Sequence, residues 1–335
     1  MIKPKQTHSK KELSVKDYVS GLADGNISIL GRIITLVEST RLDHQKLAQD
    51  ILEQCMPTTG KSVRIGITGV PGVGKSTFIE SFGKLLTSLG KKVAVLAIDP
   101  SSEQGRGSIL GDKTRMEALS VDPMAFIRPS PNAGSLGGVA RKTRESILLC
   151  EAAGYDVIIV ETVGVGQSET AVHSMVDFFL LLMLTGAGDE LQGIKRGIME
   201  MADALTITKA DGDNINKSKL AVGDYKRAIH LFPAKPNNWI PKVLTCSAYE
   251  NTGIEEIWET ISSFVNHCKC NNTFEENRKK QAQFWLHESI QEQLGNYFYQ
   301  KPEVKKLLPQ LEKEVVEGRL SPFIAANQLI DIFKK

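Results

Sequence analysis

The chain has 335 residues, of which 41% are apolar and 24% are charged, and its formal net charge is +2. These values are ordinary for a globular protein, and the length allows one large α/β domain with extensions or two modest domains. The even charge balance gives no reason to expect nucleic acid or an anionic membrane as a partner. The most apolar run, 178–184, is too short to span a bilayer, and the Lys-rich first 16 residues do not resemble a signal peptide. We therefore expect a cytoplasmic protein.

The five cysteines indicate free thiols rather than a disulfide framework. Their number is odd, and no two of them form a Cys-x-x-Cys pair. Cys150 and Cys246 lie in apolar stretches, which is usual for buried free thiols. Cys268 and Cys270 follow His267, but a single intervening residue is not the spacing of a zinc site. This cysteine usage fits a reducing cytoplasm.

The first 60 residues predict helices, and the middle of the chain predicts a parallel sheet. Apolar residues recur at helical spacing in 17–22 and 27–51. Between 61 and 266, short apolar runs alternate with helical stretches. These runs are 63–68, 93–98, 157–160, 178–184, 204–208 and 243–245. The alternation predicts an α/β fold with a mostly parallel, doubly wound sheet that helices cover on both faces.

The composition changes at about residue 267. Residues 268–280 are polar and charged, and amphipathic helices are predicted over 281–299, 304–317 and 321–333, with Pro302 and Pro322 near the starts of the last two. This tail contains no nucleotide motif, so it either packs on the core or forms an arm for dimerisation or partner binding. We divide the chain into an N-terminal helical extension (1–60), an α/β domain (61–266) and a C-terminal helical arm (267–335).

A phosphate-binding loop lies between the first predicted strand and the helix predicted over 77–89. The string Gly69-x-x-x-x-Gly74-Lys75-Ser76 is a P-loop in that context. Backbone N–H groups of such a loop point at phosphate oxygens, and the helix that follows adds partial positive charge. We expect Lys75 to reach the β- and γ-phosphates and Ser76 to be a Mg²⁺ ligand. The residues expected to hold the nucleotide here are Gly69, Val70, Pro71, Gly72, Val73, Gly74, Lys75, Ser76 and Thr77.

Acidic residues follow two further strands. Asp99 comes directly after 93–98, where a carboxylate can bind Mg²⁺ or its waters, or can cap the next helix. Glu161 comes directly after 157–160 and is expected to hold the metal through water. The N–H of Gly164 would then bind the terminal phosphate. Gln167 would orient the attacking water or act as a polar switch residue.

Two loops further along the chain predict guanine recognition. Thr208-Lys209-Ala210-Asp211 resembles the Asn-Lys-x-Asp motif of GTPases, with Thr in place of Asn. The Asp211 carboxylate would accept two hydrogen bonds from guanine, which adenine cannot donate. The stem of Lys209 can pack on the base. Ser247 and Ala248 fit the supporting loop that contacts the guanine carbonyl. The ordered motifs predict GTP and GDP as ligands rather than ATP.

A basic cluster remains open to two interpretations. Arg115, Arg128, Arg141, Lys142 and Arg144 lie in segments rich in Gly and Ser. A mobile basic loop near a phosphate could stabilise transition-state charge, as an arginine finger does. Alternatively, the cluster is a solvated basic surface.

Several longer strings resemble the MeaB/ArgK/MMAA family of GTPases, which accompany methylmalonyl-CoA mutase. The strings are 107–116, 128–131 with 137–144, 160–168 and 186–195, and the resemblance covers about 15–335. It implies a G-protein chaperone whose GTP hydrolysis gates delivery and retention of adenosylcobalamin by an acyl-CoA mutase, with methylmalonyl-CoA mutase as the default. It also implies that Asp112 belongs to the switch around Mg²⁺, that Asp189 and Lys195 act in a further switch, and that the tail is a homodimer arm.

The chain departs from the family pattern at two places. Thr208 replaces Asn, and residues 103–106 read Glu-Gln-Gly-Arg where an apolar, glycine-rich stretch is usual. Two other functions were weighed. A transport-linked ATPase or kinase is disfavoured by the guanine motif, and a metallocentre-assembly GTPase is disfavoured because the six histidines are scattered.

Overall fold

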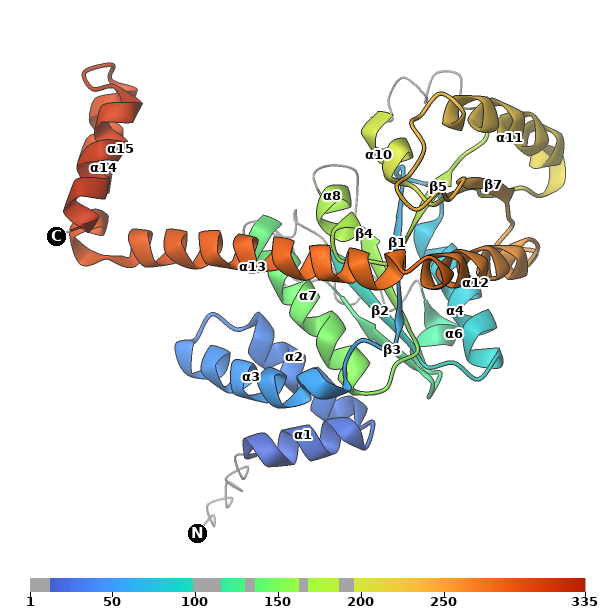
Figure 1. Ribbon diagram of the computed structural model, residues 1–335, viewed down its shortest axis with the longest axis horizontal. Helices are drawn as coiled ribbons and strands as arrows, with labels where there is room; N and C mark the ends of the chain where they lie inside the picture. The colour runs from blue at the N-terminus through green and yellow to red at the C-terminus, as the bar shows by residue number, and fades with distance from the viewer. Residues whose placement is uncertain (1–12, 99–115, 130–135, 163–167, 187–195, 335) are drawn as a thin grey trace, which may run out of the picture. The chain divides into compact units, whose positions relative to one another are not determined.

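The computed structural model describes residues 13–98, 116–129, 136–162, 168–186 and 196–334. These residues divide into two compact units, 1–279 and 280–335, each of which is described by itself. Figure 1 shows the helices and strands along the chain.

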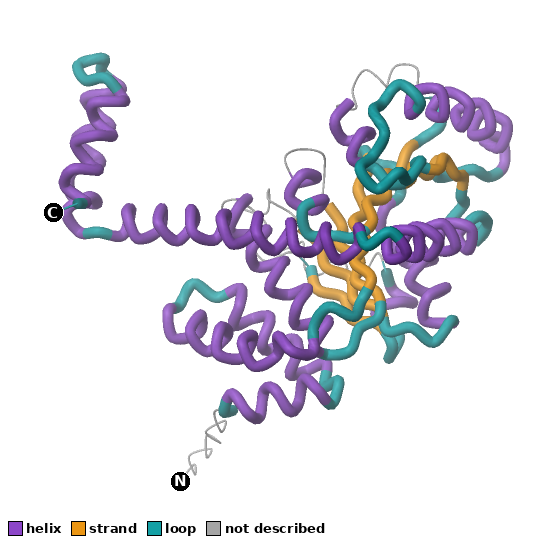
Figure 2. Tube along the Cα trace, viewed as in Figure 1, coloured by secondary structure: helices purple, strands orange, loops and turns teal. Residues whose placement is uncertain are grey.

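One parallel sheet forms the centre of the first unit. Within the described residues it has seven strands in the order β3-β2-β4-β1-β5-β6-β7, drawn in orange in Figure 2. All neighbouring strands run parallel. The strands are β1 (Val63–Gly69), β2 (Val93–Ile98), β3 (Ala125–Arg128), β4 (Val157–Thr162), β5 (Phe178–Met183), β6 (Ala204–Ile207) and β7 (Lys242–Thr245). The predicted doubly wound α/β fold is confirmed, and β3 is a strand that the sequence analysis missed.

Helices cover both faces of this sheet. One core cluster joins alternate strand residues such as Ile65 and Leu180 to Phe82 and Ile261, which lie on α4 (Lys75–Ser88) and α12 (Ile254–Cys270). The intervening strand residues face the other way. On that side lie α7 (Leu136–Ala152), α8 (Ser168–His173), α10 (Arg196–Met201) and α11 (Ile215–Ile229). Short helical turns are α6 (Glu117–Ser120), η1 (Met56–Thr58) and η3 (Gly212–Asn214).

The predicted N-terminal helices are present, with one break that the sequence analysis missed. They are α1 (Val15–Ala23), α2 (Ile27–Glu38) and α3 (Leu42–Cys55), so the helical pattern over 27–51 is interrupted at residues 39–41. Their buried side chains, such as Ile33 and Ile34, pack among the three helices, which also contact α7. The extension is therefore anchored on the helix that covers β2 and β4.

The second unit is helical. Helix α13 (Thr273–Gln300) begins in the first unit, so part of the stretch predicted to be a polar linker is helix. Helices α14 (Pro302–Val316) and α15 (Pro322–Phe333) form a hairpin around Val304, Leu311, Ala325 and Leu329. Both begin with proline, as predicted, because proline fits the first turn of a helix, where its missing N–H leaves no bond unmade.

A buried ion pair closes the amino-terminal edge of the sheet. Arg64 on β1 donates from Nε and Nη2 to Glu151 on α7 at 2.8 and 2.9 Å, and both side chains are almost fully buried. Ser62 Oγ and Gly60 N–H also donate to Glu151, at 2.6 and 2.9 Å. Burial alone would raise the pKa of Glu151, but the hydrogen bond and charge of Arg64 outweigh it and hold that pKa below its usual value. The stabilisation therefore exists above the unfolded-state pKa and is lost as the pH falls.

A second ion pair joins the start of α13 to the same edge. Asp177, just before β5, accepts from Arg278 Nε at 2.8 Å and from Arg278 Nη2 at 2.6 Å. The same carboxylate accepts the N–H of Arg64 at 2.8 Å. Arg278 also donates to the carbonyl oxygens of Gly60 and Ser62, at 2.5 and 2.6 Å. The first turns of α13 are thus tied to β1 and β5.

Replacing Glu151 should test the weight of the buried network. Glu151→Gln leaves the Arg64 guanidinium buried without its counter-charge, so we expect a loss of about 3 to 5 kcal/mol in the free energy of unfolding. Urea unfolding at neutral pH measures it. The matched control is Asp224→Asn, which removes an exposed pair with Arg227 and should cost less than about 1 kcal/mol. Equal losses in the two variants would contradict the assignment.

Candidate functional site

The P-loop connects β1 to α4 at the carboxyl edge of the sheet. Gly72 and Gly74 have φ angles of +78° and +88°, a left-handed conformation that favours glycine. A Cβ on Gly69 would lie 2.6 Å from the carbonyl oxygen of Leu182, so that position admits no side chain. Lys75, Ser76 and Thr77 begin α4, where backbone N–H groups and the helix dipole favour an anion. The loop therefore has the local geometry that the sequence predicts.

Lys75 lies beside two buried carboxylates. Its Nζ donates to the carbonyl oxygen of Gly69 at 2.8 Å. Burial lowers the pKa of Lys75, and the charges of Glu161 at the end of β4 and Glu169 on α8 oppose that shift. Both carboxylates are almost fully buried. The sequence analysis missed Glu169, although its place two residues beyond Gln167, at the start of a helix, was a usable signal.

The guanine motif is fixed to the P-loop by two hydrogen bonds. Thr208 Oγ1 donates to the carbonyl oxygen of Val73 at 2.7 Å, with Met183 O a second acceptor 3.2 Å away. Lys209 has a φ of +54° and donates from Nζ to the carbonyl oxygen of Gly72 at 2.8 Å. The Thr208 hydroxyl thus contacts the phosphate loop, which is a role that the sequence analysis did not foresee for it.

Ser247 fixes the carboxylate of Asp211. Its Oγ donates to Asp211 Oδ2 at 2.5 Å and accepts the N–H of Glu250 at 3.0 Å. The N–H of Ser247 and the carbonyl oxygen of Thr252 pair at 3.0 Å, which closes the loop on itself. A carboxylate oxygen has two lone pairs, so Oδ2 can still accept a bond from a ligand. The two predicted base-binding loops therefore meet.

Ala248 and α4 complete this corner of the site. The carbonyl oxygen of Ala248 accepts Ser81 Oγ on α4 at 2.9 Å, and the N–H of Ala210 donates to Cys246 O at 3.1 Å. Both base-recognition loops are therefore hydrogen-bonded to neighbouring elements. We interpret this as a preformed base site.

Several predicted site residues lie outside the described residues. They are Asp99, Asp112, Gly164 and Gln167, together with Arg115, Asp189 and Lys195. Of the four predicted metal ligands, the structure therefore describes Ser76 and Glu161. Their hydroxyl and carboxylate oxygens are the donors that Mg²⁺ prefers, so this part of the set fits the ion. Among the described residues, no group of three or more His, Cys, Asp or Glu could hold a metal.

The described members of the basic cluster are largely engaged with other side chains. Arg128 pairs with Glu38, and Arg141 pairs with Glu145 at 3.6 Å. Arg144 is mostly buried, and burial lowers its pKa to about 10, helped by the like charge of Arg64. These arginines do not form an open basic surface, and Arg128 is bound to a carboxylate rather than extended as a finger.

Further observations concern the cysteines and the helices. All five cysteines are free thiols, and four of them are buried, including Cys150 and Cys246 as predicted. Within the described ranges, no helix combines the length and the apolar character needed to cross a membrane.

The fold and site define a P-loop nucleotide-binding protein of the doubly wound α/β class. The sequence model of the family described as "Methylmalonyl Co-A mutase-associated GTPase MeaB" matches residues 30–303. The chain therefore belongs to this family of GTPases, as the sequence strings predict.

Similar proteins cover nearly the whole chain. A "Putative GTPase" of Caulobacter vibrioides is 52% identical over 93% of this chain and 95% of its own length. "GTPase ArgK" of Escherichia coli is 45% identical over 96% and 98%. "Methylmalonic aciduria type A homolog, mitochondrial" of Mus musculus is 46% identical over 97% and 81%. A crystal structure titled "LAO/AO transport system kinase" superposes with a TM-score of 0.75, at 39% identity, over 97% of this chain and 99% of that one.

Asp211→Asn should move base preference from guanine towards xanthine. The amide replaces an acceptor with a donor, which matches the extra carbonyl of xanthine and loses a charged hydrogen bond to guanine. We expect GDP affinity to fall about tenfold to a hundredfold. Titration with fluorescent GDP and xanthosine diphosphate measures both affinities. Asp224→Asn on α11 is the matched control and should bind as the unchanged protein does. An unaltered guanine preference in Asp211→Asn would refute the base assignment.

Proposed function

We propose that this GTPase uses Mg²⁺ and works as a chaperone that gates loading and retention of adenosylcobalamin by an acyl-CoA mutase. The observation that carries the proposal is the family match, whose description names methylmalonyl-CoA mutase, over residues 30–303. Methylmalonyl-CoA mutase is therefore the default client. The mouse relative, named for methylmalonic aciduria, agrees with that choice.

In this proposal Lys75 exchanges a backbone partner for the nucleotide. Its ammonium group now donates to Gly69 O, and a terminal phosphate would replace that carbonyl oxygen. Burial strengthens the attraction between the ammonium group and phosphate because little water screens the charge. Glu161 and Glu169 keep the ammonium charged in spite of burial.

The metal would be held by Ser76, Asp99, Asp112 and Glu161, of which Glu161 acts through water. Mg²⁺ bound there neutralises charge on the phosphates. Gly164 would donate its N–H to the terminal phosphate, and Gln167 would orient the attacking water. The charge and hydrogen bonds that the protein supplies would therefore be concentrated at the carboxyl edge of β1, β2 and β4.

The base would bind between Lys209 and Asp211. The Lys209 side chain already crosses to the P-loop through its bond to Gly72 O, so its stem is held in place. Asp211 is held by Ser247, which lowers the entropy that is lost when guanine binds. A prearranged base site favours stable binding of GTP and GDP over rapid exchange.

Control of the client requires different affinities for it with GTP and with GDP. A nucleotide that bound both conformations equally would shift nothing. We place the protein in the cytoplasm, and the free cysteines support that location. The transport-linked kinase alternative is kept only because a similar structure is titled a kinase. Phosphate released to water supports the GTPase, whereas phosphate transferred to an added acceptor supports the kinase.

Nucleotide-dependent capture of the client tests the chaperone role. The protein, loaded with GDP or with a non-hydrolysable GTP analogue, is mixed with purified cobalamin-dependent mutases, and complexes are quantified by size-exclusion chromatography. We expect the yield of complex to differ at least about tenfold between the two nucleotides, since coupling energies are typically about 1 to 3 kcal/mol.

Asp211→Asn supplies the control for this experiment. Its complex should respond to xanthosine nucleotides rather than to guanosine nucleotides if the base site drives the response. The absence of any nucleotide-dependent complex with any of the mutases would leave a GTPase without this client.

We also propose that the second unit mediates homodimerisation. In α13, Leu286, Ile290, Leu294 and Tyr297 recur at intervals of four, four and three, which places them on one helical face. Each is at least 45% exposed within the described chain. An exposed apolar stripe of this length on a helix marks an interaction surface, and a second copy of the same helix is a self-complementary occupant.

Charge on the stripe should break the dimer. The two leucines of the stripe, Leu286 and Leu294, are each changed to Glu in a double variant. We expect this variant to sediment as a monomer because two carboxylates would lose solvation in the interface. Leu220→Glu on α11, also an exposed leucine, is the control and should keep the mass of the unchanged protein. A monomeric unchanged protein would refute the proposal.

A further inference from the structure

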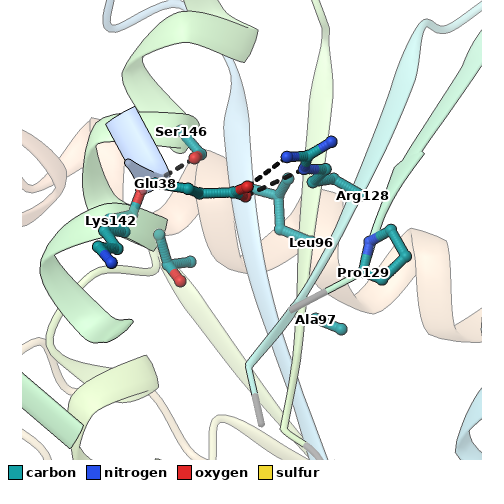
Figure 3. A pocket seen from close by; sticks show the side chains of 8 residues that line it. Glu38, Leu96, Ala97, Arg128, Pro129, Lys142 and Ser146 are labelled. Carbon is teal, nitrogen blue, oxygen red and sulfur yellow. Dashed lines mark hydrogen bonds and ion pairs between the residues drawn. The ribbon is translucent and has the colours of Figure 1, made fainter. Parts of the chain in front are cut away.

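A residue of the N-terminal extension holds the end of an edge strand. Arg128 is the last residue of β3, and its Nε donates to Glu38 Oε1 at 3.0 Å. Its Nη2 donates to Glu38 Oε2 and to Thr35 Oγ1, the latter at 3.2 Å. Figure 3 shows the two side chains meeting at the end of the strand. This two-pronged geometry is the stronger form of an arginine–carboxylate pair.

The ion pair is shielded from solvent. The side chains of Arg128 and Glu38 are 28% and 15% exposed. Leu96, Ala97 and Lys142 line a small pocket beside the pair, and its 10 Å³ holds about one water molecule. Limited hydration keeps the attraction stronger than in a surface pair.

Strand β3 needs this support more than its neighbours do. It has four residues, lies at the end of the sheet, and pairs only with β2 among the described strands. Its last residue, Arg128, is the register partner of Leu96, which lies three residues before Asp99. The pair therefore acts where the segment that begins at Asp99 leaves the sheet.

A different helix holds the other end of β3. Asp122, three residues before the strand, accepts Lys84 Nζ at 2.7 Å and Thr87 Oγ1 at 2.8 Å, both from α4. The hydrogen bond from Lys84 lowers the pKa of Asp122, so this carboxylate is charged at neutral pH. The two ends of one short strand thus carry comparable ion pairs, and of these two only the Glu38 pair lies at the carboxyl edge.

We propose that Glu38 is a positioning residue for GTP hydrolysis. Acting through Arg128, it fixes the carboxyl ends of β3 and β2, and with them the point from which Asp99 is presented to the metal. The inference rests on the proposed metal role of Asp99. It makes the N-terminal extension part of the hydrolytic apparatus, acting through the sheet rather than by touching the nucleotide.

The kinetics of Glu38→Gln, Arg128→Gln and the double variant test this role. We expect each single variant to lower kcat about tenfold at saturating GTP and Mg²⁺, since small displacements of reacting groups are costly. GDP affinity should stay within about twofold, because the P-loop and base loop are untouched. The double variant should be no worse than either single one, since both remove the same interaction.

Asp122→Asn is the matched control at the opposite end of β3. It should lower the melting temperature about as much as Glu38→Gln while kcat stays unchanged. A kcat of Glu38→Gln within about twofold of the unchanged protein would overturn the proposal. An equal loss of kcat in Asp122→Asn would also overturn it, because the effect would then be general loss of stability.

Asp99→Ala separates this inference from the function on which it rests. No hydrolysis by the unchanged protein would refute the proposed function itself. Full activity in Asp99→Ala would refute the route through Asp99, and with it this proposal. Loss of kcat in Asp99→Ala together with Glu38→Gln supports both.

Discussion

The hydroxyl of Thr208 donates to Val73 O, and the ammonium group of Lys209 donates to Gly72 O, so the loop expected to recognise the base is bonded to the loop expected to hold the phosphates. This constraint sets the spacing of the two halves of the nucleotide site. Because Gly72 and Gly74 adopt left-handed conformations, the P-loop can bring its carbonyl oxygens within reach of these side chains. The hydroxyl at position 208 thus serves the connection between loops, which explains how the chain tolerates the absence of the usual asparagine.

Local motifs were predictable from the sequence, and long-range partners were not. The P-loop and the order of the strands follow from spacing and apolar runs, which depend on neighbouring residues. Strand β3 was missed because four residues leave too little periodicity to detect. The roles of Glu169 beside Lys75 and of Glu38 beside Arg128 depend on contacts between residues far apart in the chain. The segments around Asp99 and Gln167 lie outside the described residues, so those expectations stay predictions.

Charge is distributed differently at the two edges of the sheet. At the amino-terminal edge, Arg64, Glu151, Asp177 and Arg278 satisfy one another in a nearly complete network. At the carboxyl edge, Lys75 and its neighbouring carboxylates surround a site suited to an ionic ligand. The strongest buried ion pairs are therefore concentrated away from the P-loop, and the ionic groups near the P-loop can change partners without unfolding the sheet.

Strand β5 connects these two regions. Just before its first residue, Asp177 holds Arg278 at the start of α13, and its last residue, Met183, accepts the N–H of Thr208 at 2.8 Å. Six buried residues join these points, and a buried strand paired on both sides is stiff. A displacement of the base loop is therefore resisted at the root of the helix that continues into the second unit. If nucleotide state is to reach a partner bound to that unit, β5 is the shortest covalent and hydrogen-bonded route that the described residues provide.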